Sequence, residues 1–167
     1  MIVEPDEARA RGEMSESATP KRVLIVAHRT AASPPLIDEV RERVSRGPCA
    51  FALLVPRPPE AADPDGEEVK RTLELAIPLI EEAAGARVEA MAGDCDPYVA
   101  VCETLQEREF DEVIVSTLPE RVSRWLRRDL PHRVRQLGVP VTVVTAPQAQ
   151  RPLWDDETAT ALRRLAG

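Results

Sequence analysis

The stretch from Asp111 to Val144 constrains the fold more than any other part of this sequence. An apolar run at Glu112–Ser116 and a second run at Val139–Val144, rich in β-branched residues, are both typical of strands. The segment between them is long enough for a helical crossover, so the two strands should lie parallel in one sheet. Ligands of open α/β sheets bind beyond the carboxyl ends of the strands. We therefore expect function to concentrate in the loop after Ser116.

Earlier parts of the chain repeat the same alternation of strands and helices. Three more strands are predicted at Lys21–Ala27, Cys49–Val55 and Arg87–Ala92. Capping residues and helical spacing predict helices that begin after Ser33, at Glu67, after Asp96 and after Asp129. Pro78 predicts a kink in the second helix, or its break into two pieces. Five strands alternating with four helices define a doubly wound α/β fold.

The chain suits one domain of ordinary size. We place this α/β domain at residues 21–146, and its core must be aliphatic because the chain has only two Phe, two Trp and one Tyr. Residues 1–20 are acidic and proline-containing with no sustained period, which predicts a disordered tail. Residues 147–167 are predicted to form a polar linker and a short C-terminal helix.

Charge and cysteine content exclude several classes of protein. The formal net charge of −7 argues against nucleic acid or an anionic membrane as a partner. The three cysteines form neither an even set nor a close pair, so no disulfide framework is indicated. The sequence shows no secretory leader and no apolar run long enough to span a bilayer. These features predict a cytoplasmic protein.

The order of these elements, together with three motifs, resembles the universal stress protein family over roughly Lys21 to Thr145. The motifs are RVLIVAHRTAAS, Gly93-Asp94 followed by Asp96-Pro97, and DEVIVS with HRVRQLGVPVTVV. The resemblance implies a parallel five-stranded sheet of order 3-2-1-4-5 with helices on both faces. It also implies a regulatory or stress-response role and, as in many members, a homodimer through the last strand. One subgroup of the family binds ATP.

The phosphate-binding loop of that subgroup is altered in this chain. The loop is G-x-x-G, nine residues, then G-[ST], and its glycines let backbone N–H groups approach phosphates. The corresponding positions here are Ser116, Pro119, Asp129 and Leu130. Pro119 has no N–H to donate, and Asp129 would bring a carboxylate close to any triphosphate. The acidic residue that the family places after the first strand is His28 here. We therefore expect no cofactor and no ATP binding of the family's kind.

The segment after the fourth strand has two interpretations. It carries six arginines between Ser116 and Arg135, whose guanidinium groups suit phosphate or carboxylate. In the first interpretation it binds a small ligand or anion. The candidate binding residues are then His28, Thr30, Val55, Ser116, Thr117, Ser123, Arg124 and Arg128. In the second interpretation the segment packs through Trp125 and its apolar neighbours, and its arginines are solvated.

No catalytic constellation is recognisable, so we expect a protein that is not an enzyme. Hydroxyl groups are plentiful, but no nucleophile-elbow signature is present. Asp94, Cys95 and Asp96 cluster near the expected place of His28, yet the cysteines lack zinc spacing and no metal is expected. Cys95 could be an accessible, redox-reactive thiol.

The fifth strand lies at an edge of the predicted sheet. An uncovered edge rich in β-branched residues invites pairing with a second chain. We therefore expect a homodimer through Val139, Val141 and Val143. The alternative is an edge shielded by the segment around Trp154. The leading hypothesis is a non-enzymatic, universal-stress-like regulatory domain, and the second is a sensor of a small anionic ligand.

Overall fold

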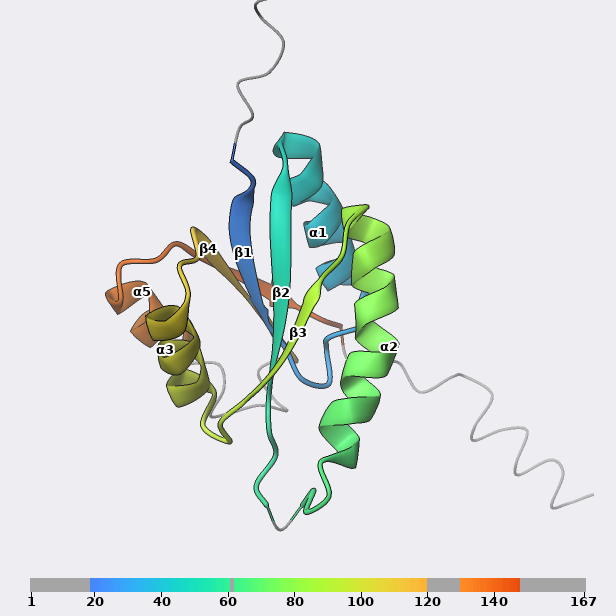
Figure 1. The fold of residues 1–167 in the computed structure, drawn as a ribbon, viewed down its shortest axis with the longest axis vertical. Coiled ribbons are helices and arrows are strands. Elements are labelled where there is room, and N and C mark those ends of the chain that lie inside the picture. Colours follow the sequence, from blue (N-terminus) through green and yellow to red (C-terminus); the bar gives the residue numbers. More distant parts are fainter. Residues whose placement is uncertain (1–18, 61, 120–129, 148–167) are drawn as a thin grey trace, which may run out of the picture.

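The computed structural model describes residues 19–60, 62–119 and 130–147, which form one parallel sheet with helices on both faces (Figure 1). The elements in chain order are β1 (Lys21–Val26), α1 (Pro34–Arg46), β2 (Cys49–Pro56), α2 (Glu67–Ala84), β3 (Glu89–Gly93), α3 (Pro97–Glu107), β4 (Glu112–Thr117), α5 (Leu130–Gln136) and β5 (Val141–Thr145). The strand order is β3-β2-β1-β4-β5, which confirms the predicted order 3-2-1-4-5. The predictions for residues 1–18 and 148–167 lie outside the described residues.

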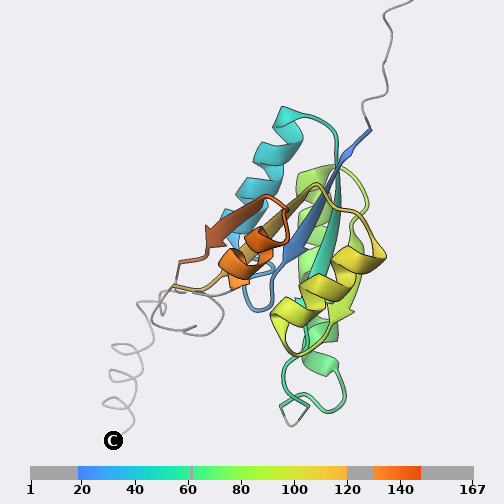
Figure 2. The same cartoon turned by 90° about the vertical axis from the view of Figure 1, so that its left-hand side faces the viewer.

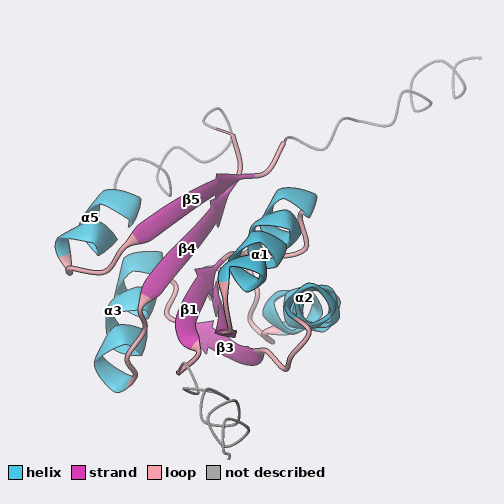
Figure 3. Ribbon diagram, turned by 90° about the horizontal axis from the view of Figure 1, so that it is seen from above, coloured by secondary structure: helices cyan, strands magenta, loops and turns pink. Residues whose placement is uncertain are grey.

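Two apolar layers hold the helices to the sheet. Side chains alternate between the faces of a strand, so a run without polar residues feeds both layers. In β1, Val23 and Ile25 enter the layer beneath α1 and α2, whereas Leu24 and Val26 enter the layer beneath α3 and α5. Figure 3 shows these two helix pairs on opposite sides of the sheet. All four residues are almost fully buried, which explains the continuous apolar run.

Two strands begin two residues later than the sequence predicts, while the carboxyl ends of all five differ from the prediction by one residue. β3 begins at Glu89 rather than Arg87, and β5 begins at Val141 rather than Val139. Pro140 explains the second difference, because it has no N–H to donate to the ladder with β4. Its carbonyl still accepts a hydrogen bond from the Val113 N–H at 2.9 Å. β5 therefore lies beside β4 at one edge of the sheet, as Figure 2 shows.

Pro78 does not divide the second helix. α2 runs without interruption from Glu67 to Ala84, so the predicted break into two pieces is wrong. Pro78 is exposed, and so is Glu74, whose carbonyl loses its hydrogen-bond donor to the proline ring. On the solvent side that carbonyl can bond to water, which makes the proline tolerable.

The predicted helix caps are formed in two different ways. Asp96 caps α3 through its carboxylate, which accepts the N–H groups of Tyr98 and Val99 at 2.8 and 3.2 Å. This confirms the expected cap. Ser33 precedes α1 as predicted, but its carbonyl, not its hydroxyl, accepts the first helical N–H groups. The predicted cap at Asp129 lies in the segment 120–129, outside the described residues.

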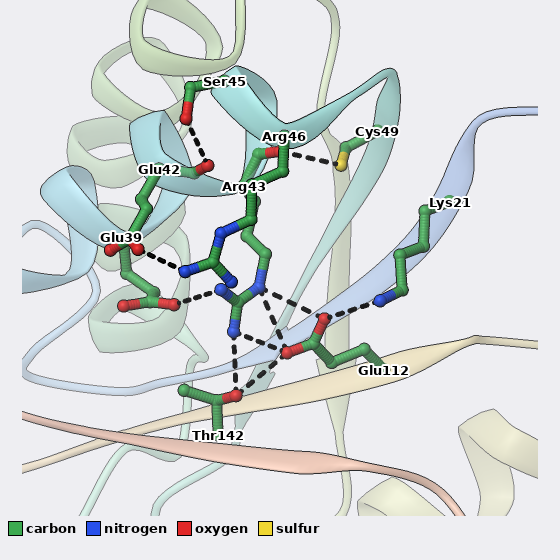
Figure 4. Close-up of polar contacts among 9 residues, drawn as sticks. All are labelled: Lys21, Glu39, Glu42, Arg43, Ser45, Arg46, Cys49, Glu112 and Thr142. Carbon is green, nitrogen blue, oxygen red and sulfur yellow. Dashed lines mark hydrogen bonds and ion pairs between the residues drawn. The ribbon is translucent and has the colours of Figure 1, made fainter.

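A buried ion pair fastens α1 to the sheet (Figure 4). Arg43 of α1 and Glu112 of β4 are only 8% and 5% exposed. The Arg43 Nε donates to both carboxylate oxygens of Glu112 at 3.1 and 3.2 Å, and its Nη2 donates to Oε1 at 2.6 Å. Bidentate pairs of this kind combine strength with a fixed geometry. The pair therefore sets how α1 lies across β4.

Neighbouring groups satisfy the remaining polar atoms of this pair. The Thr142 hydroxyl of β5 accepts from Arg43 at 2.8 Å and donates to Glu112 at 2.9 Å. Glu39 pairs with the third guanidinium nitrogen at 2.7 Å, and Lys21 lies 3.4 Å from Glu112. Burial alone would raise the pKa of Glu112, but the hydrogen bonds from Arg43 and Thr142 lower it below the ordinary value of 4.5. The carboxylate is therefore charged at neutral pH.

Arg43→Ala should destabilise the protein by about 3–5 kcal/mol, because it leaves the buried Glu112 charge without a partner. The measurement is the free energy of unfolding from urea titration. Arg41→Ala on the same helix is the matched control, since Arg41 and its partner Asp38 are both exposed; its cost should stay within about 0.5 kcal/mol. Equal costs for the two variants would contradict a stabilising role of the buried pair.

Candidate functional site

A pocket of about 400 Å³ lies at the carboxyl ends of β1, β2 and β4. Its lining comes from the ends of three strands and the loops that follow them: residues 26–30 at β1, residues 56–59 and 62 at β2, and residues 116–118 at β4. Residue 95 before α3 and residue 97 at its start also contribute. Glu68 of α2 completes it. From β1 the chain moves to β2 on one side, while β4 lies on the other side, so this is the point where the strand order reverses. The pocket is therefore where the sequence predicted a site.

Two residues of the pocket lining carry a buried hydroxyl group without a hydrogen-bond partner among the described residues. Ser116 and Thr117, at the end of β4, are each 2% exposed and line the pocket. Their backbone carbonyls are occupied: Ser116 accepts from the Thr30 hydroxyl at 3.0 Å, and Thr117 accepts from the Ala146 N–H at 2.8 Å. Their hydroxyl oxygens are buried and unpaired within the described ranges. A buried polar group without a hydrogen-bond partner lowers the free energy of unfolding by about 1–3 kcal/mol.

His28, directly after β1, also lines the pocket and is half-buried. Its Nε2 is 3.6 Å from the Glu68 carboxylate at the start of α2, which is too long for a hydrogen bond. Burial lowers the pKa of His28 below 6.5, and the positive charge of Arg29 acts in the same direction. The carboxylates of Glu68 and Asp63 oppose this shift without reversing it. The imidazole is therefore mainly neutral at neutral pH.

Several pocket residues were not identified from the sequence. The wall formed after β2 contains Pro56, Pro58 and Pro59, and two arginines, Arg29 and Arg57, also line the pocket. A proline cluster directly after a buried strand was the available signal, because it lies at the same end of the sheet as Ser116. Glu68 gave no such signal, since only the tertiary fold brings the first turn of α2 to His28.

The predicted binding residues divide into three groups. His28, Thr30, Ser116 and Thr117 come together in the pocket lining. Val55 does not line the pocket and is fully buried in the layer beneath α1 and α2. Ser123, Arg124 and Arg128 lie outside the described residues, so the choice between a binding and a packing role for their segment stays a prediction.

The cluster of acids and cysteine before α3 is engaged in local structure. Asp94 accepts the Asp96 N–H at 2.9 Å, and Asp96 caps α3, while Cys95 between them is exposed and lines the pocket. Within the ranges 19–60, 62–119 and 130–147, no group of three or more His, Cys, Asp or Glu side chains is placed to hold a metal ion. No helix in these same ranges is long and apolar enough to cross a bilayer.

The pKa of His28 should fall further in a Glu68→Gln variant, because the largest influence that raises it is then removed. An NMR titration of the imidazole resonances measures this shift directly, with Glu67→Gln at the neighbouring exposed position as the control. The direction in which folding shifts the pKa of His28 also determines how the stability of the protein depends on pH. Folding lowers the pKa of His28, so its contribution to stability is complete above pH 6.5 and is lost as pH falls through the folded-state pKa. A higher pKa in Glu68→Gln would contradict the proximity of the two groups.

Comparison with solved structures identifies the fold. No protein-family model and no curated protein matches the sequence. Among the solved structures that match this one are three structures of universal stress proteins with a bound nucleotide. A complex with cAMP matches with a TM-score of 0.55 and 15% identity, covering 77% of this chain and 99% of that one. The universal stress protein from Archaeoglobus fulgidus in complex with dAMP matches with a TM-score of 0.55 and 17% identity, covering 75% of this chain and 98% of that one. A universal stress protein family protein from Arabidopsis thaliana with AMP bound matches with a TM-score of 0.54 and 16% identity, covering 84% of this chain and 99% of that one. This chain therefore has the fold of the universal stress proteins.

Proposed function

We propose that this chain is a non-enzymatic regulatory domain of the stress-response type, acting in the cytoplasm, that binds a small polar ligand in the pocket at the carboxyl ends of β1, β2 and β4. The observation that carries the proposal is the pair of buried hydroxyls of Ser116 and Thr117. A ligand that exchanges hydrogen bonds with them would recover the free energy that their burial costs. A hydroxyl both donates and accepts, so the pocket suits a ligand with mixed hydrogen-bonding groups.

The other walls of the pocket narrow the chemistry of the ligand. Prolines 56, 58, 59 and 97 supply apolar surface that suits a flat ring, and Arg29 and Arg57 supply positive charge for an anionic group. A nucleoside monophosphate combines these features, and the solved structures of the same fold hold cAMP, dAMP and AMP. We therefore propose AMP or a ligand of similar size and charge.

A triphosphate is a poorer candidate than a monophosphate. Backbone N–H groups of a glycine-rich loop would have to surround its phosphates. In this chain Ser116 and Pro119 stand at the first two glycine positions of the family's nucleotide loop, and Pro119 has no N–H to donate. The distinction between AMP and ATP therefore tests whether the altered loop matters.

The arrangement of polar groups supports binding rather than nucleophilic catalysis. A hydroxyl nucleophile needs a base within hydrogen-bond reach. Among the described residues, neither the hydroxyl of Ser116 nor that of Thr117 makes a hydrogen bond to the His28 Nε2. A protein of this kind would act by changing its stability or its contacts when the ligand binds.

The proposed domain acts as a homodimer through β5. The Pro140 carbonyl faces β4, so the backbone groups of Val141 and Val143 point outward from the sheet. Arg135 donates to the outward Val141 carbonyl at 3.4 Å, while Val143 is 40% exposed. Val139 and Val141 pack partly against the layer beneath α3 and α5, so Val143 would be the centre of the pairing. The alternative, shielding by the segment around Trp154, lies outside the described residues.

A Ser116→Ala, Thr117→Val double variant should be as stable as the unmodified protein or more stable, because it removes two unpaired buried hydroxyls. The same variant should lose the rise in melting temperature that AMP gives to the unmodified protein. Thr30→Val is the contrasting control, since it removes a hydrogen bond to the Ser116 carbonyl and should cost about 1 kcal/mol. Thermal unfolding with and without AMP measures both effects.

Two outcomes would overturn the proposed ligand chemistry. If AMP leaves the melting temperature of the unmodified protein unchanged, the pocket does not take a nucleoside monophosphate. If ATP binds more tightly than AMP in isothermal titration, with one nucleotide per chain, the altered loop has no consequence for phosphate binding.

Val143→Glu should convert a dimer into a monomer, because it places a charge at the exposed centre of the β5 edge. Sedimentation velocity measures the oligomeric state, and circular dichroism checks that the fold is kept. Leu75→Glu on α2 is the matched control, since Leu75 is 62% exposed and lies on another element. A protein that sediments as a monomer before any substitution contradicts the dimer, and so does equal dissociation by both variants.

A further inference from the structure

Cys95 occupies an unusual position among the three cysteines of this chain. It is the exposed one, it lies in the turn between β3 and α3, and it lines the pocket that also holds His28. The backbone on either side is fixed. The Asp94 carboxylate accepts a hydrogen bond from the Asp96 N–H, and the Asp96 carboxylate accepts one from the Tyr98 N–H. The Arg57 N–H donates to the Gly93 carbonyl at 3.3 Å. The thiol is therefore held at the mouth of the pocket.

A second observation makes this position more than an exposed thiol. Ser116 and Thr117 line the same pocket, and their buried hydroxyls have no hydrogen-bond partner within the described parts of the chain. Unpaired polar groups in a pocket mark a place where another molecule is held. A group attached to Cys95 would enter a space already suited to a small polar molecule.

The other two cysteines lie in less reactive surroundings. Cys49 is partly buried at the start of β2, and its thiol points to the carbonyls of Gly47 and Arg43 at 3.5 and 3.7 Å. Burial raises the pKa of Cys49, which lowers its thiolate fraction at neutral pH. Cys102 lies within α3 and is partly buried. Since the thiolate of an accessible cysteine is the attacking species, Cys95 should react first.

We propose that Cys95 is a modification site for small disulfides, and that the group it acquires occupies the mouth of the pocket and blocks it. The Cys95 thiolate attacks one sulfur of the disulfide and forms a mixed disulfide, while the other half leaves as a thiolate and takes up the proton that Cys95 lost. The small disulfide is the oxidant, so the step needs no further reagent. A thiol reductant reverses it. The proposal depends on the pocket and not on the identity of its ligand.

The test uses the full chain and an uncharged probe, 2-hydroxyethyl disulfide, which does not interact strongly with the charges of Asp94, Asp96 or Arg57. Peptide mapping by mass spectrometry follows the modification of each cysteine over time. Cys95 should be modified at least about tenfold faster than Cys49 or Cys102, because it alone is exposed. A Cys49→Ser, Cys102→Ser variant should keep the fast reaction, and Cys95→Ser should lose it.

The imidazole resonances of the two histidines then show where the acquired group lies. The resonance of His28, which lines the pocket, should shift in the modified protein and return after reduction. The resonance of His132, exposed on α5, should stay unchanged, and Cys95→Ser treated in the same way should show neither change. Similar rates at all three cysteines, or an unchanged His28 resonance after Cys95 is modified, would overturn the proposal.

These outcomes are separate from the test of the proposed function. Selective modification with a shifted His28 resonance, in a protein that does not bind AMP, leaves the thiol site standing and removes only the proposed ligand class. AMP binding together with an unreactive Cys95 supports the proposed ligand class and removes the thiol site.

Discussion

Burial of β4 on both faces is the constraint on which the arrangement of this domain depends. Every residue of the strand from Glu112 to Thr117 is buried, yet the first and the last two carry polar side chains. Helices on both faces are needed to cover such a strand, and neighbours on both edges are needed to pair its backbone. β1 and β5 pair with the two edges of β4, and the strand order reverses between β1 and β4.

The buried polar side chains at the two ends of β4 differ in whether they are hydrogen-bonded. At the amino end, Arg43, Thr142 and Lys21 surround the Glu112 carboxylate and satisfy it. At the carboxyl end, the hydroxyls of Ser116 and Thr117 have no partner within the described residues. A satisfied network holds elements in place, whereas unpaired buried groups are expected where a protein binds something. The first end therefore serves the fold, and the second end is the better candidate for function.

The pocket also brings together groups with different chemical behaviour. His28 is kept mainly neutral by burial, Arg29 and Arg57 supply positive charge, and Cys95 supplies a thiol at the mouth. A ligand held there would contact segments that follow β1, β2 and β4. Binding in such a place can change how firmly these loops are held, and such a change would report the presence of the small molecule.

The sequence by itself determined the strands and the helices, because continuous apolar runs and capping residues such as Asp96 act through local chemistry and burial. The strand order was expected only from the resemblance to the universal stress proteins, and the structure confirms it. It also indicated that His28, Thr30, Ser116 and Thr117 lie near one another, since carboxyl ends of parallel strands share one edge of the sheet, and all four line one pocket. Only the tertiary structure decided that Arg43 meets Glu112, that Glu68 faces His28, and that Val55 lies in the core and not in the pocket. These depend on which side chains long-range packing brings within a few ångströms, and no local pattern encodes that distance.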